Sequence, residues 1–111
     1  MNIGSYELKP QYTNQKSFYG KAQVFMTRDG NDVFLSLRSY STFVVSVYIS
    51  SYGTPFVKKL WNGYSATMMR HINELLMQHG FPKLSSRVWC AMGVGKFYHP
   101  DEIPALDLFT K

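Results

Sequence analysis

The chain has 111 residues, 45% of them hydrophobic and 17% charged, which excludes a disordered protein and leaves room for one globular domain with a modest core. Its single cysteine, Cys90, excludes an intramolecular disulfide, and we expect this thiol to be buried among its apolar neighbours. The net charge of +5 favours a polyanionic partner, either nucleic acid or an acidic protein face, although solubility alone also accounts for such a charge.

The first half of the chain predicts an antiparallel meander. Residues 1–16 read as an irregular lead-in, with room for one short edge strand. Alternating patterns over Ser17–Thr27 and Asp32–Tyr40 flank an Asp-Gly turn, which is a strong hairpin signal. Further strands are predicted at Phe43–Ser50 and Phe56–Trp61. In the third strand, alternation puts Phe43 on the same face as Val45 and Val47, and Val44 on the face of Tyr48.

An amphipathic helix is predicted at about residues 65–79. Ser65 can cap its first turn, and Gly80 followed by Phe81 and Pro82 is typical of a Schellman stop. Its apolar stripe is made by Met68, Ile72, Leu75 and Leu76. We expect the opposite, polar side of the helix to be solvated; it carries Thr67, Arg70, His71, Glu74 and Gln78.

After the helix, Arg87–Met92 reads as a strand, and residues 100–111 read as an acidic, flexible tail. The predicted fold is α+β: a single domain, residues 1–111, with an antiparallel meander sheet of three to five strands and one amphipathic helix packed on one face. Residues 33–100 hold seven basic side chains and one acid, so the body of the domain is basic and its end is acidic.

The outward side of the sheet is the strongest candidate for a binding surface. Aromatic rings interleaved with lysine and arginine are the pattern of single-stranded nucleic acid binding, in which rings stack on bases and cations pair with phosphates. The alternative is a solvated sheet face with cross-strand Tyr–Lys pairs. The predicted partner- or nucleic-acid-binding residues are Tyr19, Lys21, Arg38, Tyr40, Tyr48, Lys58, Lys59 and Arg70.

No motif in the chain predicts catalysis, a metal or a cofactor. His71, His79, His99 and Cys90 lack the short spacing of zinc ligands. The stretch Gly93–Lys96 lacks the residues that complete a phosphate-binding loop, and no nucleophile elbow is present. We therefore expect a protein that is not an enzyme.

Two segments together resemble a known family. They are KPQYTNQKSFYGKAQV at Lys9–Val24 and GYSATMMRHINELLMQHGF at Gly63–Phe81, with SLRSYSTFV between them. This order is similar to a family of small uncharacterised proteins of phages and plasmids of low-GC Gram-positive bacteria. The resemblance covers most of residues 9–81 and supplies no catalytic residues.

The resemblance implies a small phage- or plasmid-borne binding protein that inhibits a host defence complex. One such protein would be an anti-CRISPR protein, which acts on a CRISPR-Cas effector or on the binding of its guide RNA or DNA. The alternative is a sequence-tolerant nucleic-acid-binding accessory or regulatory protein. The expected partner is a host protein or ribonucleoprotein complex, with RNA or DNA as a direct contact. No secretory signal or membrane segment is recognisable, so we expect the protein in the cytoplasm of the bacterial host.

Overall fold

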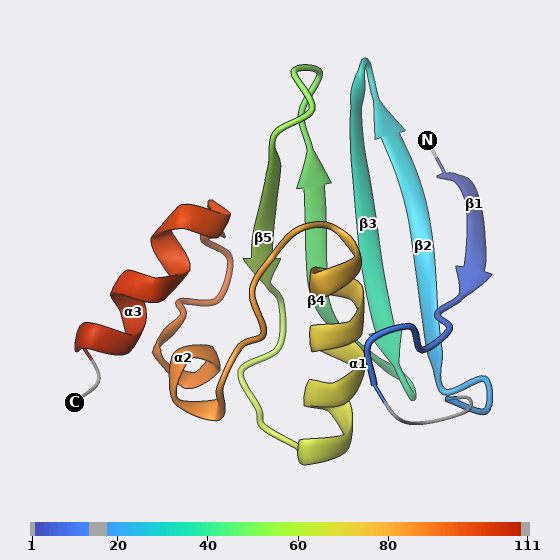
Figure 1. Ribbon diagram of the computed structural model, residues 1–111. Helices are drawn as coiled ribbons and strands as arrows, with labels where there is room; N and C mark the ends of the chain where they lie inside the picture. The colour runs from blue at the N-terminus through green and yellow to red at the C-terminus, as the bar shows by residue number, and fades with distance from the viewer. Residues whose placement is uncertain (1, 14–17, 110–111) are drawn as a thin grey trace.

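Six antiparallel strands follow one another in one sheet, in the order β1-β2-β3-β4-β5-β6 (Figure 1). The computed structural model describes residues 2–13 and 18–109. The strands are β1 (Asn2–Glu7), β2 (Ala22–Asp29), β3 (Asp32–Ser39), β4 (Thr42–Ile49), β5 (Pro55–Lys59) and β6 (Phe97–Tyr98). The expected α+β meander is confirmed. The sheet has more strands than the expected three to five, because β1 forms within the lead-in and β6 is added beyond the predicted helix. Residues 14–17, where the lead-in meets the first expected strand, lie outside the described residues.

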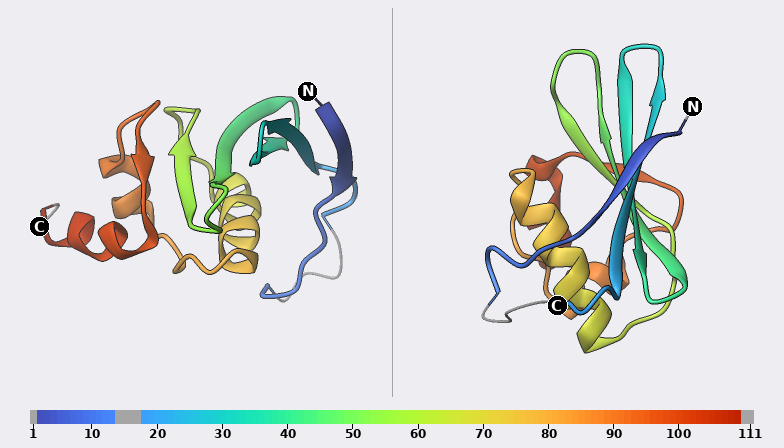
Figure 2. Two further views of the ribbon diagram at one scale, coloured as in Figure 1. Left: turned by 90° about the horizontal axis from the view of Figure 1, so that it is seen from above. Right: turned by 90° about the vertical axis from the view of Figure 1, so that its right-hand side faces the viewer.

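The main helix, α1 (Ala66–Gln78), lies across one face of the sheet (Figures 1 and 2). The shorter elements α2 (Ser86–Ala91), η1 (Pro100–Glu102) and α3 (Ile103–Phe109) follow on the β5 side of the molecule (Figure 1). None of the helices in the described part of the chain has the length and apolar character that crossing a bilayer requires.

Both ends of α1 are set by the residues expected from the sequence. The Ser65 side chain accepts from the Met68 amide, which satisfies one of the free donors of the first turn. At the other end, Gly80 has a φ of 86°. The amides of Gly80 and Phe81 donate to the carbonyls of Met77 and Leu76, at 3.3 and 3.0 Å. This is a Schellman motif, and Phe81 is buried beside it.

The core lies between α1 and the face of the sheet that α1 covers, here called the inner face. Ile72, Leu75 and Leu76 of α1 are fully buried there. The sheet contributes alternate residues of each strand, as period-two alternation requires. Those buried on the inner face are Ala22, Val24, Leu35, Leu37, Val45, Val47 and Val57.

A β-bulge in β4 changes the face of one aromatic residue. Leu37 pairs with Val45 but Arg38 pairs with Phe43, so Val44 is the extra residue. Phe43 therefore lies beside Arg38 on the outer side of the sheet, not on the face of Val45 as alternation predicts, and Val44 is buried. A bulge adds one residue to a strand, and the alternation changes face at that point.

Part of the polar side of α1, at His71 and Glu74, is covered, which corrects the expectation of a fully solvated surface; Arg70 on the same side is exposed. The segment after β1 runs over this side, with Leu8 fully buried. Glu74 is also fully buried, and its Oε1 accepts from the amides of Tyr12 and Thr13 at 2.9 and 3.2 Å. His71 is 2% exposed, and its Nδ1 lies 2.7 Å from the Ser39 hydroxyl. Each of these polar residues has a hydrogen-bond partner, which offsets the free-energy cost of burying it.

Residues Ser86–Ala91 form the helix α2, so the predicted strand at Arg87–Met92 is wrong. The Ser85 side chain accepts from the Val88 amide and caps the helix. Val88, Trp89 and Met92 are buried on one side. Cys90 lies on the opposite side and is exposed, which contradicts its expected burial. A short apolar run does not distinguish a strand from a helix. Here the N-cap serine, Ser85, favours the helix.

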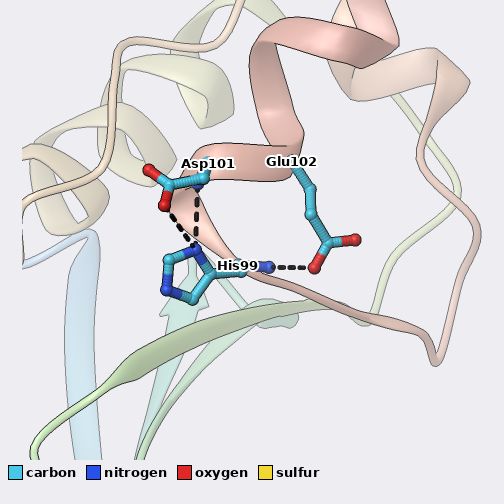
Figure 3. A network of polar contacts seen from close by, with 3 residues as sticks. All are labelled: His99, Asp101 and Glu102. Carbon is cyan, nitrogen blue, oxygen red and sulfur yellow. Dashed lines mark hydrogen bonds and ion pairs between the residues drawn. The ribbon is translucent and has the colours of Figure 1, made fainter.

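Residues 100–109 form η1 and α3 where the sequence predicts a flexible acidic tail. The turn begins at His99, whose Nδ1 accepts from the Asp101 amide while Glu102 accepts from the His99 amide (Figure 3). This reciprocal capping box, with Pro100 in the first helical position, starts the helical segment. Ile103 is 3% exposed and attaches the segment to the core.

Candidate functional site

The side of the sheet opposite α1 carries many aromatic and basic side chains. In the described part of the chain no helix crosses this side (Figure 2). Strand pairing places its outward residues in rows, one of which runs from β2 to β6. We call this surface the open face; it carries Phe25, Phe34, Ser36, Arg38, Phe43, Ser46, Tyr48, Phe56, Lys58 and Phe97.

One row of the open face consists of stacked rings. The ring centroids of Phe34 and Tyr48 are 4.9 Å apart, with an angle of 21° between the ring planes. Phe56 stacks on the other side of Tyr48 at 6.1 Å. His99 meets Phe56 edge-on at 5.5 Å. Cross-strand aromatic pairs of this kind stabilise a sheet, and they also make a rigid apolar surface.

Two cations lie over rings on the side of this row that is farther from Asp32. Lys58 Nζ is 5.2 Å from the centroid of Phe97, and the Arg38 guanidinium carbon is 5.0 Å from that of Phe25. Phe43 lies 5.5 Å from Phe25, next to Arg38. Phe43 and Phe97 are each 45% exposed, so these two rings are the large apolar groups of the open face most accessible to a ligand.

The centre and one end of the open face are polar. Ser36 and Ser46 face each other across β3 and β4, with their hydroxyl oxygens 3.3 Å apart. At the start of β3, a hydrogen bond with Asp32 raises the pKa of Tyr48, and burial and the charges of Asp32 and Asp29 act in the same direction. The acids at this end repel an anion, so an anionic ligand would bind toward Arg38 and Lys58.

The Arg38 side chain is an unusual part of this surface. Its Nε is buried and has no hydrogen-bond partner among the described residues. A buried donor without a partner is unfavourable, and such groups are often found where a ligand or water completes the site. Its guanidinium lies over the Phe25 ring, and Phe43 is its neighbour on β4; a flat guanidinium group both stacks on rings and binds phosphate.

The structure separates the predicted binding residues into groups. Arg38, Tyr48 and Lys58 lie together on the open face. Tyr19, Lys21 and Tyr40 lie at an end of the sheet near α1: Lys21 Nζ is 5.4 Å from the Tyr40 ring, and that ring is 5.9 Å from the ring of His71. Tyr19 and Tyr40 both occupy turns, with φ values of 53° and 57°. Arg70 lies on α1, on the other side of the sheet.

Lys59, predicted as a surface residue, is buried at 1% exposure. Its Nζ donates to the carbonyls of Trp89 and Met92 at 2.7 and 3.3 Å and lies 4.6 Å from the centre of the Trp89 ring. Burial lowers the pKa of Lys59. Lys59 shares the inward face of β5 with Val57, and it connects that strand to the C-terminal end of α2.

Most of the rings on the open face are absent from the binding residues predicted from the sequence. Phe25 and Phe34 follow the same alternation as Gln23 and Arg38, so the strand pattern alone could have placed them. Phe97 required the pairing of β6 with β5, which links residues far apart in the sequence. Phe43 required knowledge of the bulge.

The histidines lie apart in the fold. His71 is in the core, His79 is the C-cap of α1, and His99 begins η1. In the described ranges, no three His, Cys, Asp or Glu side chains come close enough to hold a metal ion.

Comparisons with curated proteins and with solved structures found no match. A scan against protein families found one match, to a family of unknown function, over residues 6–91. The matched residues extend from the end of β1 through α2, and therefore include the strands β2 to β5 of the open face. Strand β6, which carries Phe97, lies after the matched residues. Because the match covers more than half of the chain, the protein belongs to this family of unknown function, DUF8033.

Proposed function

We propose that the protein acts by binding, without catalysis, and that its open face binds single-stranded RNA or DNA. The observation that carries this proposal is the position of Arg38 and Lys58 beside the exposed rings of Phe43 and Phe97. Single-stranded nucleic acid offers unpaired bases for stacking and phosphates for ion pairing, and sheet faces with aromatic and basic residues recognise it in this way.

The arrangement of these groups supports a footprint of more than one nucleotide. Phe43 is on β4 and Phe97 is on β6, with β5 between them. Neighbouring strands are about 4.8 Å apart, so the two rings are on the order of 10 Å apart across the sheet. Ser36, which is partly exposed, lies between the aromatic groups and offers its hydroxyl to a sugar or phosphate, while the neighbouring Ser46 is buried. The net charge of +5 adds long-range attraction for the polyanion.

The cellular role that we propose is inhibition of a host defence complex, in which the bound nucleic acid is part of a ribonucleoprotein such as a CRISPR effector. The resemblance of Lys9–Val24 and Gly63–Phe81 to small phage and plasmid proteins supports this role. The competing function is that of a nucleic-acid-binding accessory or regulatory protein, which would use the same face on free RNA or DNA. The positive charge of Arg38 and Lys58 on the open face would also complement an acidic protein surface, which is the alternative class of partner.

Binding is tested by fluorescence anisotropy with a labelled single-stranded oligonucleotide, and with its duplex, over a series of salt concentrations. On a single strand each neutralised phosphate contributes about 0.7 to the slope of log K against log salt. We expect Arg38→Gln and Lys58→Gln each to reduce the slope by about this amount. Arg87→Gln, which removes an exposed charge on α2, is the matched control and should leave the slope unchanged.

The rings are tested with Phe43→Leu and Phe97→Leu, which keep an apolar side chain but remove the flat surface. Stacking is worth about 1–3 kcal/mol per base, so each variant should weaken binding roughly 5- to 150-fold. Absence of binding to either oligonucleotide at low salt, or binding that does not change with salt, would reject the proposal.

The cellular role is tested by pull-down from a host lysate, with and without nuclease. Nuclease-sensitive capture of a ribonucleoprotein that Arg38→Gln loses supports the inhibitor. Capture of free RNA or DNA alone favours the accessory protein, and nuclease-resistant capture through the same residues assigns the open face to an acidic protein.

A further inference from the structure

A groove with a volume of about 790 Å³ lies on the helix side of the molecule, away from the open face. It is lined by the segment after β1 that contains Tyr12 and Thr13 (here called the N-terminal segment), by Tyr64 just before α1, by α1 itself, and by the connection between α1 and α2 with the first residue of α2. Its volume falls in the range of about 300–1,000 Å³ that is usual for small-molecule sites. The side chains that matter for its chemistry are Tyr12, Tyr64, Met69, Arg70, Met77 and Lys83.

The wall formed by the connection between α1 and α2 is held in place by Asn73. This side chain is 6% exposed. Its Oδ1 accepts from the Leu84 amide at 2.8 Å, and its Nδ2 donates to the Leu84 carbonyl at 3.0 Å. Both hydrogen-bonding groups of the amide are therefore used on one residue of the connection. Asn73 and Leu84 both line the groove, so this wall is fixed before any ligand binds.

The wall formed by the N-terminal segment is held by Glu74. Its carboxylate accepts from the amides of Tyr12 and Thr13 and from Gln78 Nε2. Gln78 Nε2 also donates to the Lys9 carbonyl at 3.0 Å. The segment is thus attached to α1 at several points. A groove with fixed walls needs little reorganisation when a ligand binds, which favours affinity.

The charges and rings that line the groove define the ligand. Arg70 and Lys83 are its charged residues, both are basic and exposed, and no acid lines the groove within the described ranges. Tyr12 and Tyr64 are 55% and 52% exposed. Met69 and Met77 supply flexible apolar surface that adapts to an aromatic group. Two cations beside apolar and aromatic surface complement an anionic group carried on a ring.

We propose that this groove is a second binding site, which takes a small organic anion: a phosphate or carboxylate carried on an aromatic body, of about the size of a mononucleotide. This assigns Arg70, which lies far from Arg38 and Lys58 in the fold, to a separate ligand. The site is independent of nucleic acid binding by the open face. Either proposal can therefore fail without the other.

The test is an NMR titration of the ¹⁵N-labelled protein with adenosine monophosphate as the probe and adenosine as the neutral control. The reporters are the Leu84 amide and the side-chain amide of Asn73, and the amides of Lys58 and Phe97 report on the open face. Adenosine monophosphate should shift the groove reporters, and adenosine should bind at least about tenfold more weakly. An exposed ion pair contributes up to ~1 kcal/mol, so Arg70→Gln and Lys83→Gln should each weaken binding by about threefold to fivefold.

Arg87→Gln is the control, because it removes an exposed charge that does not line the groove, and it should leave the affinity unchanged. Thermal melts of the three variants check that each is folded. Shifts confined to the open face, equal binding of adenosine, or unchanged affinity in both Arg70→Gln and Lys83→Gln would each overturn the proposal. An oligoglutamate peptide that shifts the groove reporters when adenosine monophosphate does not would overturn it too, in favour of an acidic peptide.

Discussion

Replacement of Glu74 by alanine should release the N-terminal segment from α1. The carboxylate is fully buried and accepts three hydrogen bonds, at 2.9, 3.2 and 2.7 Å from Tyr12 N, Thr13 N and Gln78 Nε2. Bonds to a charged group contribute about 1.5–3 kcal/mol each, and the desolvation of the carboxylate offsets part of that sum. The released amides can bind water, because Tyr12 is 55% exposed. We therefore expect the free energy of unfolding to fall by about 2–3 kcal/mol.

Glu74→Gln separates the charge from the shape of this side chain. It keeps an oxygen that can accept from the two backbone amides, and it loses the charge and the favourable contact with Gln78. The expected loss is about 1 kcal/mol. Asp101→Ala removes a carboxylate that is 92% exposed and contacts only the partly exposed His99, at 3.4 Å, among the ion pairs of the described residues; it is the control for net charge.

Two measurements check this prediction: urea denaturation and amide hydrogen exchange at Tyr12 and Thr13. In Glu74→Ala these two amides should lose most of their protection, while the amides of β3 and β4 keep theirs. Unchanged protection at Tyr12 and Thr13 would mean that other contacts hold the segment, and the explanation of why Glu74 is buried would be refuted.

Three further predictions concern the core, the helix stop and the response to acid. Leu75→Ala, at a fully buried position, should reduce the free energy of unfolding in urea by about 2–5 kcal/mol, and an unchanged midpoint would contradict the packing of α1. Gly80→Ala should lower stability by roughly 1 kcal/mol, because φ is 86° there; Gly53→Ala, at a φ of 82° in a loop, tests whether the loss is general to such positions. Burial, with the Arg70 charge second, lowers the pKa of His71, and burial lowers that of His79. Because the two histidines then bind protons more readily in the unfolded chain, the free energy of unfolding should be highest above pH ~6.5. It should fall as the pH drops through the folded-state pKa values. His71→Gln should flatten this dependence, and an identical pH profile in that variant would assign it to other groups.

The elements with local signals were predictable from the sequence. Ser65 and Gly80 mark the ends of α1 because a helix terminus requires particular residues within a few positions. The alternation in β2 and β3 follows from the burial of one face. Ser85 was a comparable signal for α2, but the apolar residues after it also fit a strand.

The remaining features depend on contacts between distant residues. Lys59 is buried because the carbonyls of Trp89 and Met92, about thirty residues away, accept its hydrogen bonds. Glu74 is buried because the segment at Tyr12 crosses α1. No local pattern contains either partner. For the same reason the strand alternation predicted Arg38 and Tyr48 on one face of the sheet but did not bring Lys58 and Phe97 beside them.

The central claim, that the open face binds single-stranded nucleic acid, is tested most directly by photo-cross-linking followed by mass spectrometry. A 4-thiouridine-labelled oligouridine would be irradiated with the full-length protein at low salt, and the cross-linked residues would be identified. We expect cross-links at Phe43 and Phe97, and fewer of them in Arg38→Gln and Lys58→Gln. Cross-links confined to Tyr19 and Tyr40, or to Tyr12 and Tyr64 at the groove, would contradict it and move the binding surface to the other side of the sheet.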